Sequence, residues 1–216
     1  KRFLGDHQVI YEPEDFFKTR VVESVRQGLY ELSAEAKALI ASEGVTKLEK
    51  ATKKQNPPAA YDLTELQRDA NKKYGYSAKQ TLSLMQSLYE YHKVLTYPRT
   101  DSRYITDDIV ATLPERLRSM AVGPYQASAM KLARGKIETK YIVNNAKVSD
   151  HHAIIPTEQS PNLSKLSYDE RNIYDLVVRR FMAVLSEPFQ YDEVKIEIAA
   201  DKGSFYAKGK TPIKQG

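Results

Sequence analysis

Apolar residues in the middle and later parts of the chain recur at the spacing of helix faces. Between residues 77 and 93, one face would carry Leu82, Leu84, Met85, Leu88 and Tyr89. A longer helix is predicted over residues 168–186, and its buried face would carry Ile173, Leu176, Val177, Phe181 and Val184. Capping-box patterns, a hydroxyl residue with Glu or Gln three positions later, predict helix starts at Thr64, Ser77 and Ser167. The centre of the chain is therefore expected to be mainly helical.

The helix that begins at Thr64 should be short, because Tyr74-Gly75-Tyr76 interrupts it before the next cap. Two capped helices joined by a glycine turn resemble a helix-turn-helix arrangement. An ordinary helical hairpin has the same local signals, so both interpretations stay open. A further helix is expected from Thr106-Asp107-Asp108, and Pro114 should restart or kink it.

The pattern changes from helical to alternating at the two ends of the chain. Val194, Ile196 and Ile198 alternate with charged residues, which predicts a half-buried strand that turns at residues 201–203 into residues 204–208. Residues 47–55 carry four lysines and precede Pro57-Pro58, which is typical of a linker or an exposed strand. A helical stretch is expected at residues 34–42. The predicted fold class is therefore α+β.

Composition excludes several classes of protein. The 216 residues are 41% hydrophobic and 28% charged, which indicates a folded, polar globular chain rather than a disordered one. No apolar run is long enough for a membrane span, and the N-terminus lacks a secretory signal. The absence of cysteine removes disulfides, thiol nucleophiles and cysteine-ligated zinc, so the cytoplasm is the expected compartment. The opening on Lys1 and the ending at Gly216 suggest an excised piece of something longer.

The positive charge is concentrated in the middle of the chain. The formal net charge is +5, and residues 61–156 hold fourteen Lys/Arg against ten Asp/Glu, a local excess of +4. Three of the four histidines also lie there: His92, His151 and His152. Such an excess suits a phosphate-rich partner, but it also suits an ordinary solvated surface, and charge does not decide between them.

The segment from Leu95 to Tyr104 is the densest in reactive groups. Pro98 disfavours helix at Tyr97, and in an extended stretch Tyr97 and Arg99 point to the same side. A phenol with a pKa near 10 is a poor nucleophile, but it can attack a phosphodiester when cations stabilise the developing charge. The Tyr-x-Arg triplet alone is weak evidence, since both residue types are common in this chain.

Three collinear motifs resemble type IA DNA topoisomerases, particularly the bacterial topoisomerase III branch. Residues 89–102, Tyr-Glu-Tyr-His-Lys-Val-Leu-Thr-Tyr-Pro-Arg-Thr-Asp-Ser, resemble that family's active-site segment. Residues 57–71 resemble the entry to its catalytic-tyrosine domain, and residues 150–157, Asp-His-His-Ala-Ile-Ile-Pro-Thr, resemble its second active-site motif. The resemblance covers most of the chain and is weakest over residues 1–45.

The resemblance implies roles for particular residues. Tyr97 would be the nucleophile that forms a 5′-phosphotyrosine bond with one DNA strand, Arg99 would stabilise the transferring phosphate, and His151 would position or protonate groups during cleavage. The expected DNA-binding residues are Thr96, Thr100, Asp101, Ser102, Arg103 and His152. Without the resemblance, His151 and His152 would be interpreted as ordinary surface or capping histidines.

The resemblance also implies an architecture. Residues 1–60 would be the first part of a β-rich arch domain, residues 61–188 a helical, helix-turn-helix-like catalytic-tyrosine domain, and residues 189–216 the returning arch strands. Together they would form part of a type IA topoisomerase toroid. Nothing in the sequence matches the Toprim domain with its acidic magnesium site, and the base of the toroid is missing too. Mg²⁺ is therefore expected only in the complete enzyme, with no metal held by this chain.

The implied activity is relaxation or decatenation of DNA by passing one strand through a transient break in another. The isolated chain is expected to be inactive, monomeric, cytoplasmic and associated with the bacterial nucleoid. Its expected partners are single-stranded DNA or RNA and the Toprim and base domains of the same protein, with no membrane. The alternative is a non-catalytic module that binds single strands through phosphates and tyrosine stacking.

Overall fold

A computed structural model describes residues 47–200 and 203–214, with side chains described for all of these except residues 198–205. The described residues divide into a strand unit, residues 47–55 and 188–214, and a helical unit, residues 56–187. The expected helix at residues 34–42 lies outside the described part. No helix within the described residues is long and apolar enough to cross a membrane.

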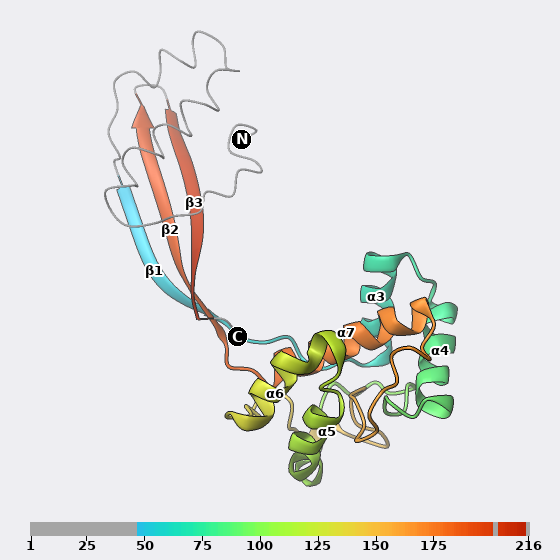
Figure 1. The fold of residues 1–216 in the computed structure, drawn as a ribbon. Helices are drawn as coiled ribbons and strands as arrows, with labels where there is room; N and C mark the ends of the chain where they lie inside the picture. The colour runs from blue at the N-terminus through green and yellow to red at the C-terminus, as the bar shows by residue number, and fades with distance from the viewer. Residues whose placement is uncertain (1–46, 201–202, 215–216) are drawn as a thin grey trace. The chain divides into compact units, whose positions relative to one another are not determined.

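The strand unit is a three-stranded antiparallel sheet in the order β1-β2-β3 (Figure 1). Its strands are β1 (Lys47–Gln55), β2 (Phe189–Ala200) and β3 (Gly203–Lys214). The ladder between β1 and β2 runs from the Lys47–Glu197 pair to the Gln55–Phe189 pair. The lysine-rich segment is thus an exposed strand, one of the two alternatives that its composition allowed.

Strand β2 is half-buried, as the alternation predicts. Val194 and Ile196 are buried while Lys195 between them is exposed, and Ile198 lies outside the described side chains. The other face holds a buried carboxylate, because Glu193 is only 4% exposed. Lys53 of β1 and Lys208 of β3 reach it at 2.5 and 3.1 Å. One side chain of the central strand therefore links both of its neighbours.

The helical unit contains five α-helices joined by short 3-10 and π turns among its described residues. The α-helices are α3 (Leu63–Tyr74), α4 (Ala78–Gln86), α5 (Leu113–Ser119), α6 (Gln126–Arg134) and α7 (Tyr168–Val184). The short turns are η1 (Ser87–Tyr91), η2 (Asp107–Thr112), η3 (Gly123–Tyr125) and η4 (Asn145–Lys147). The expected helix after Thr106 forms as η2 followed by α5, and Pro114 lies in the first turn of α5.

The long helix α7 carries the core of this unit. It contacts α3, α4 and α6, and α5 packs against α6 (Figure 1). All five apolar residues predicted for its inner face are buried: Ile173, Leu176, Val177, Phe181 and Val184. They pack in one cluster with residues from every other α-helix of the unit and from the connecting segments, among them Leu66, Met85, Leu95, Leu117, Ala129 and Ile154.

The helix starts agree with the predicted caps at two of three positions. Ser167 and Glu170 form a reciprocal capping box, and Ser77 accepts a hydrogen bond from the Gln80 amide. The first cap was misplaced, because Asp62, not Thr64, accepts from the Glu65 amide and begins α3. Asp62 and Thr64 lie two positions apart and are both favoured cap residues, with Asp the better of the two, and the capping-box pattern selected the weaker one. Gly75, at φ 74°, ends α3 in the left-handed conformation that glycine tolerates best.

The helix that begins at α4 changes character before the motif containing Tyr97. Residues 87–91 continue as the π turn η1, and such turns are frequent at functional sites. Lys93 then adopts φ 58°, and it is the single non-glycine residue with positive φ in the described part of the chain. That conformation costs a side-chain-bearing residue about 1–2 kcal/mol. The helix therefore ends at a strained, sharp turn four residues before Tyr97.

Candidate active site

Two segments far apart in sequence pair to form the floor of the site. Leu95 forms an isolated antiparallel bridge with Pro156, and the Thr96 amide donates to the Ile155 carbonyl at 3.0 Å. The Thr96 hydroxyl donates to the Ala153 carbonyl at 3.2 Å and accepts from the Ile155 amide at 3.0 Å. Residues 94–97 and 153–157 are therefore held side by side, which brings the first and second sequence motifs together.

The Tyr97 ring is held between two other rings. The His151 ring lies 4.2 Å from it, centroid to centroid, with an interplanar angle of 37°. The Tyr89 ring meets it edge-on at 5.5 Å. Tyr89 was expected on the buried face of its helix, but it is 36% exposed and contacts Tyr97 instead. The shift to π geometry after Gln86 changes the face that follows, which a regular helical pattern does not reveal.

The two arginines of the motif have different surroundings. Arg103 donates to Asp62 at 2.6 Å and approaches Glu65 at 3.2 Å, so two carboxylates neutralise it. Arg99 is exposed and makes no ion pair or hydrogen bond to any residue in the described part of the chain. Of the two guanidiniums, Arg99 is the one that is free to meet an anionic ligand.

The hydroxyl residues after Arg99 bond inward to the backbone. The buried Thr100 hydroxyl donates to the His151 carbonyl at 3.0 Å, which fixes the backbone beside the stacked ring. Ser102 is also buried, and its hydroxyl bonds to the carbonyl of Lys147 at 2.8 Å. Asp101 is exposed between them. Thr100 and Ser102 thus support the loop from inside, while direct contact of Thr96, Thr100, Asp101, Ser102 or Arg103 with DNA stays a prediction.

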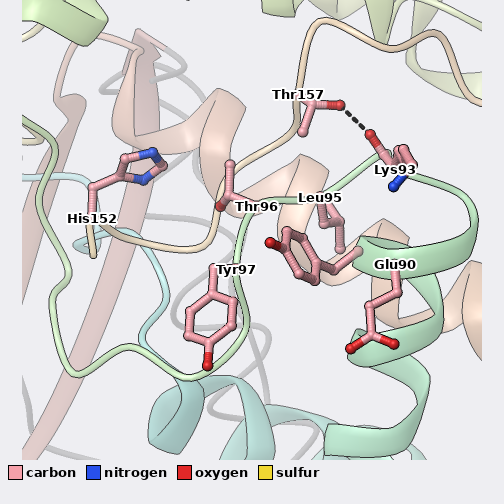
Figure 2. A pocket seen from close by; sticks show the side chains of 8 residues that line it. Glu90, Lys93, Leu95, Thr96, Tyr97, His152 and Thr157 are labelled. Atoms are coloured by element: carbon pink, nitrogen blue, oxygen red, sulfur yellow. Dashed lines mark hydrogen bonds between the residues drawn. The ribbon is translucent and has the colours of Figure 1, made fainter. Parts of the chain in front are cut away.

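A pocket of about 540 Å³ adjoins Tyr97 (Figure 2). It is lined by Tyr89, Glu90, Lys93, Leu95, Thr96, Tyr97, His152 and Thr157. The Thr157 hydroxyl donates to the Lys93 carbonyl at 2.6 Å and closes one side. Sequence reasoning missed Glu90, Lys93 and Thr157 as pocket residues. They lie inside the quoted motifs, but only the pairing of residues 94–97 with 153–157 brings them to one place.

His152 faces this pocket as a neutral ring. Burial lowers its pKa below the usual value of 6.5, the Ala153 hydrogen bond acts in the opposite direction, and the Arg116 charge lowers the pKa further. Its Nδ1 lies 2.8 Å from the Ala153 carbonyl oxygen, and a carbonyl only accepts. Nδ1 therefore carries the proton, and Nε2 is an acceptor. His151, by contrast, is exposed and stacks on Tyr97.

The described residues offer no metal site. No group of three or more His, Cys, Asp or Glu side chains in residues 47–200 and 203–214 could hold a metal ion. Three acidic residues around the motif are engaged in ion pairs: Asp62 and Glu65 pair with Arg103, and Glu158 pairs with Arg116. Magnesium therefore has no fitting set of ligands in this part of the chain, and no chemical step is assigned to it here.

Comparisons with known proteins agree on one family. The profile of the family described as DNA topoisomerase matches residues 12–216. DNA topoisomerase 3 of Bacillus cereus is 56% identical over 173 residues, which is 80% of this chain and 24% of that protein. DNA topoisomerase 3 of Bacillus subtilis is 54% identical over the same shares. The chain thus spans about a quarter of the length of these relatives.

A solved structure shows the same fold. Full-length topoisomerase I from Thermotoga maritima superposes with a TM-score of 0.60 over 84% of this chain and 30% of that one. The sequence identity is 24%, so this likeness concerns the fold alone. It confirms the predicted combination of a helical unit with a small antiparallel sheet.

Proposed function

Because the chain belongs to the DNA topoisomerase family, in its type IA class, we propose that it carries the tyrosine nucleophile of a strand-cleaving and strand-joining enzyme. Tyr97 would attack one phosphodiester of a single DNA strand. The observation that carries this proposal is the Tyr97 ring held between His151 and Tyr89, with the unpaired Arg99 two residues away.

The proposed step is a transesterification. The Tyr97 phenol oxygen forms a bond to phosphorus and loses its proton, while the bond from phosphorus to the leaving sugar oxygen breaks and that oxygen gains a proton. The product is a 5′-phosphotyrosine ester and a free sugar hydroxyl. One ester replaces another, so the reverse attack rejoins the strand without external energy. Arg99 would stabilise the charge on the phosphoryl oxygens during both steps.

His151 would act as a positioning group. Its ring contact with Tyr97 limits the rotation of the phenol, and the Thr100 bond to its carbonyl fixes its backbone. A phenol held in one orientation loses less freedom when it reaches the phosphate. His152, neutral and with Nε2 as an acceptor, would receive a hydrogen bond from the DNA or from water in the pocket.

The whole enzyme would need parts beyond this chain. Residues 61–188 would be its catalytic-tyrosine domain, and residues 1–60 and 189–216 would belong to an arch domain. Mg²⁺ would be bound by the Toprim domain, which this chain does not include. The substrates would be single-stranded regions of DNA, and the enzyme would act as a monomer in the bacterial cytoplasm. Relaxation and decatenation would follow from strand passage through the gate.

The test replaces Tyr97 by phenylalanine in a full-length polypeptide that carries this segment. Tyr97→Phe keeps the ring contacts and removes the attacking oxygen. We expect the covalent adduct with labelled single-stranded DNA to disappear from denaturing gels, while binding of the same DNA changes less than twofold. An adduct formed by the phenylalanine variant would overturn the assignment. If the unsubstituted protein binds DNA but never forms an adduct, the non-catalytic module is the correct interpretation.

A further inference from the structure

Lys93 combines two features that ordinary packing does not explain. It holds φ at 58°, a conformation that glycine or asparagine adopts at lower cost. Its side chain also lines the pocket beside Tyr97. A lysine at a position whose backbone conformation favours glycine is an outlier that motivates a hypothesis about its side chain.

The Lys93 ammonium has no carboxylate partner in the described part of the chain. By contrast, Arg103 and Arg116 are both paired with acids, at 2.6 and 2.7 Å. Glu90 lines the same pocket, but it forms no ion pair with Lys93. What fixes Lys93 is its backbone, because its carbonyl accepts from the Thr157 hydroxyl at 2.6 Å. The structure therefore fixes the Lys93 backbone and leaves its ammonium group without an acidic partner among the described residues.

We propose that the Lys93 ammonium binds a backbone phosphate of the single strand that reaches Tyr97, at a position other than the scissile phosphate. In Figure 2 the Tyr97 hydroxyl points away from Lys93, which is why we assign the lysine to a different phosphate. This inference rests on the proposed function, because that function brings a single strand to the pocket. It adds a second anchor, on the pocket side of Tyr97, to the one that Arg99 would supply.

The test measures the salt dependence of binding between the 216-residue chain and a labelled single-stranded oligothymidylate. Each phosphate neutralised by a cation contributes about 0.7 to the slope of log K against log salt for single strands. Lys93→Gly should lower the magnitude of the slope by about 0.7, which corresponds to about fivefold weaker binding at 0.1 M salt. Lys93→Gln should do the same, and Lys93→Arg should retain the slope.

One control variant and one stability measurement separate the effect of charge from that of structure. Lys79→Gln is the matched control, since Lys79 is an exposed lysine in the first turn of α4 and lies about ten residues, or roughly 15 Å of helix, before Tyr89. It should keep the slope. Lys93→Gly should also unfold at the same or a higher temperature, because glycine relieves the left-handed strain. Weaker binding by this variant is then not caused by unfolding.

Two outcomes would overturn the proposal. An unchanged slope in both Lys93→Gly and Lys93→Gln would show that the ammonium contacts no phosphate. Loss of the Lys93→Gly effect in a Glu90→Gln background would show that the lysine only neutralises Glu90. Neither outcome depends on cleavage: Tyr97→Phe should keep the full salt slope, so failure of this inference and failure of the proposed function are distinguishable.

Discussion

At the scale of single residues, the motif contains two arginines that only their surroundings distinguish. Arg99 and Arg103 lie four positions apart in the same polar loop, and either could contact phosphate. The structure pairs Arg103 with Asp62, the residue that caps α3, and leaves Arg99 exposed. We therefore expect substitutions of the two residues to have different effects.

Arg99→Ala should lower the rate of DNA cleavage by about 10²–10³ and weaken DNA binding much less, because the lost cation stabilises charge that develops in the transition state. Arg99→Lys should recover little if the guanidinium makes a bidentate contact. Arg103→Ala should instead lower the free energy of unfolding by about 1 kcal/mol, since its side chain is 40% exposed and solvent screens the pair. Single-turnover cleavage and thermal unfolding measure the two effects. Equal losses of affinity and rate for Arg99→Ala would make it a binding residue only.

Candidate site residues could be selected from sequence only where a motif gave them a context, and their chemical roles stay predictions. Tyr97, Arg99 and His151 were selected because three motifs occur in order along the chain. Lys93 and Thr157 carry no signal of their own in the sequence, since a hydrogen bond across 64 residues brings them together. The same holds for Thr100, whose hydroxyl supports the backbone of His151 rather than facing outward.

At the scale of elements, sequence patterns predicted α3, α4, α5 and α7 but not α6, and they predicted helix ends poorly. The five apolar residues predicted for the inner face of α7 are all buried because 17 residues of regular helix give a clear pattern, although Tyr174 and Val178 were not predicted. The end of α4 was not predicted. After Gln86 the π turn η1 changes which side chains share a helix face, and it brings Tyr89 to the site. The start of α3 moved by two residues because Asp62 and Thr64 are both good caps.

The sheet contains an electrostatic element that strand patterns do not reveal. Hydrogen bonds from Lys53 and Lys208 lower the pKa of the Glu193 carboxyl from 4.5 to about 2. A carboxyl with a lowered pKa in the folded state stabilises the fold above its unfolded pKa, and this contribution disappears as the pH falls through the folded value. The stabilisation should therefore be complete above about pH 5 and be lost progressively from there to about pH 2.

This pH dependence is testable with one substitution. A carbon-13 NMR titration should place the Glu193 midpoint near 2. Glu193→Gln should lower the unfolding temperature at pH 6 and reduce its decline between pH 5 and pH 2, because the amide cannot titrate. A midpoint near 4.5 would show that Lys53 and Lys208 do not hold the carboxylate in solution.

At the scale of the whole molecule, the described residues contain the proposed nucleophile Tyr97 but no group of side chains that could hold a metal ion. Within the described residues no acidic cluster can bind magnesium, and the chain spans about a quarter of the length of its relatives. We expect the isolated 216-residue chain to fold, since α7 and its partners form a continuous core, and to leave negatively supercoiled plasmid unrelaxed in the presence of magnesium. Agarose gels would detect relaxed topoisomers, and their appearance at substoichiometric protein would refute this expectation. Restoration of adduct formation by a separately made Toprim portion would support the proposed division.

The two connections between the units have a mechanical consequence. The chain leaves the sheet at Gln55 and returns at Phe189, and these two residues are paired neighbours in the ladder. A single peptide connection would let the sheet swivel, because rotation about one φ or ψ angle suffices. Two connections side by side resist such torsion, since a twist must bend both at once. The two connections also share any tension on the sheet. A pull at this end acts on β1 and β2 in the same direction, so the two strands are not drawn past one another. Any load on this end of the sheet is therefore shared by both connections, because Gln55 and Phe189 are paired there.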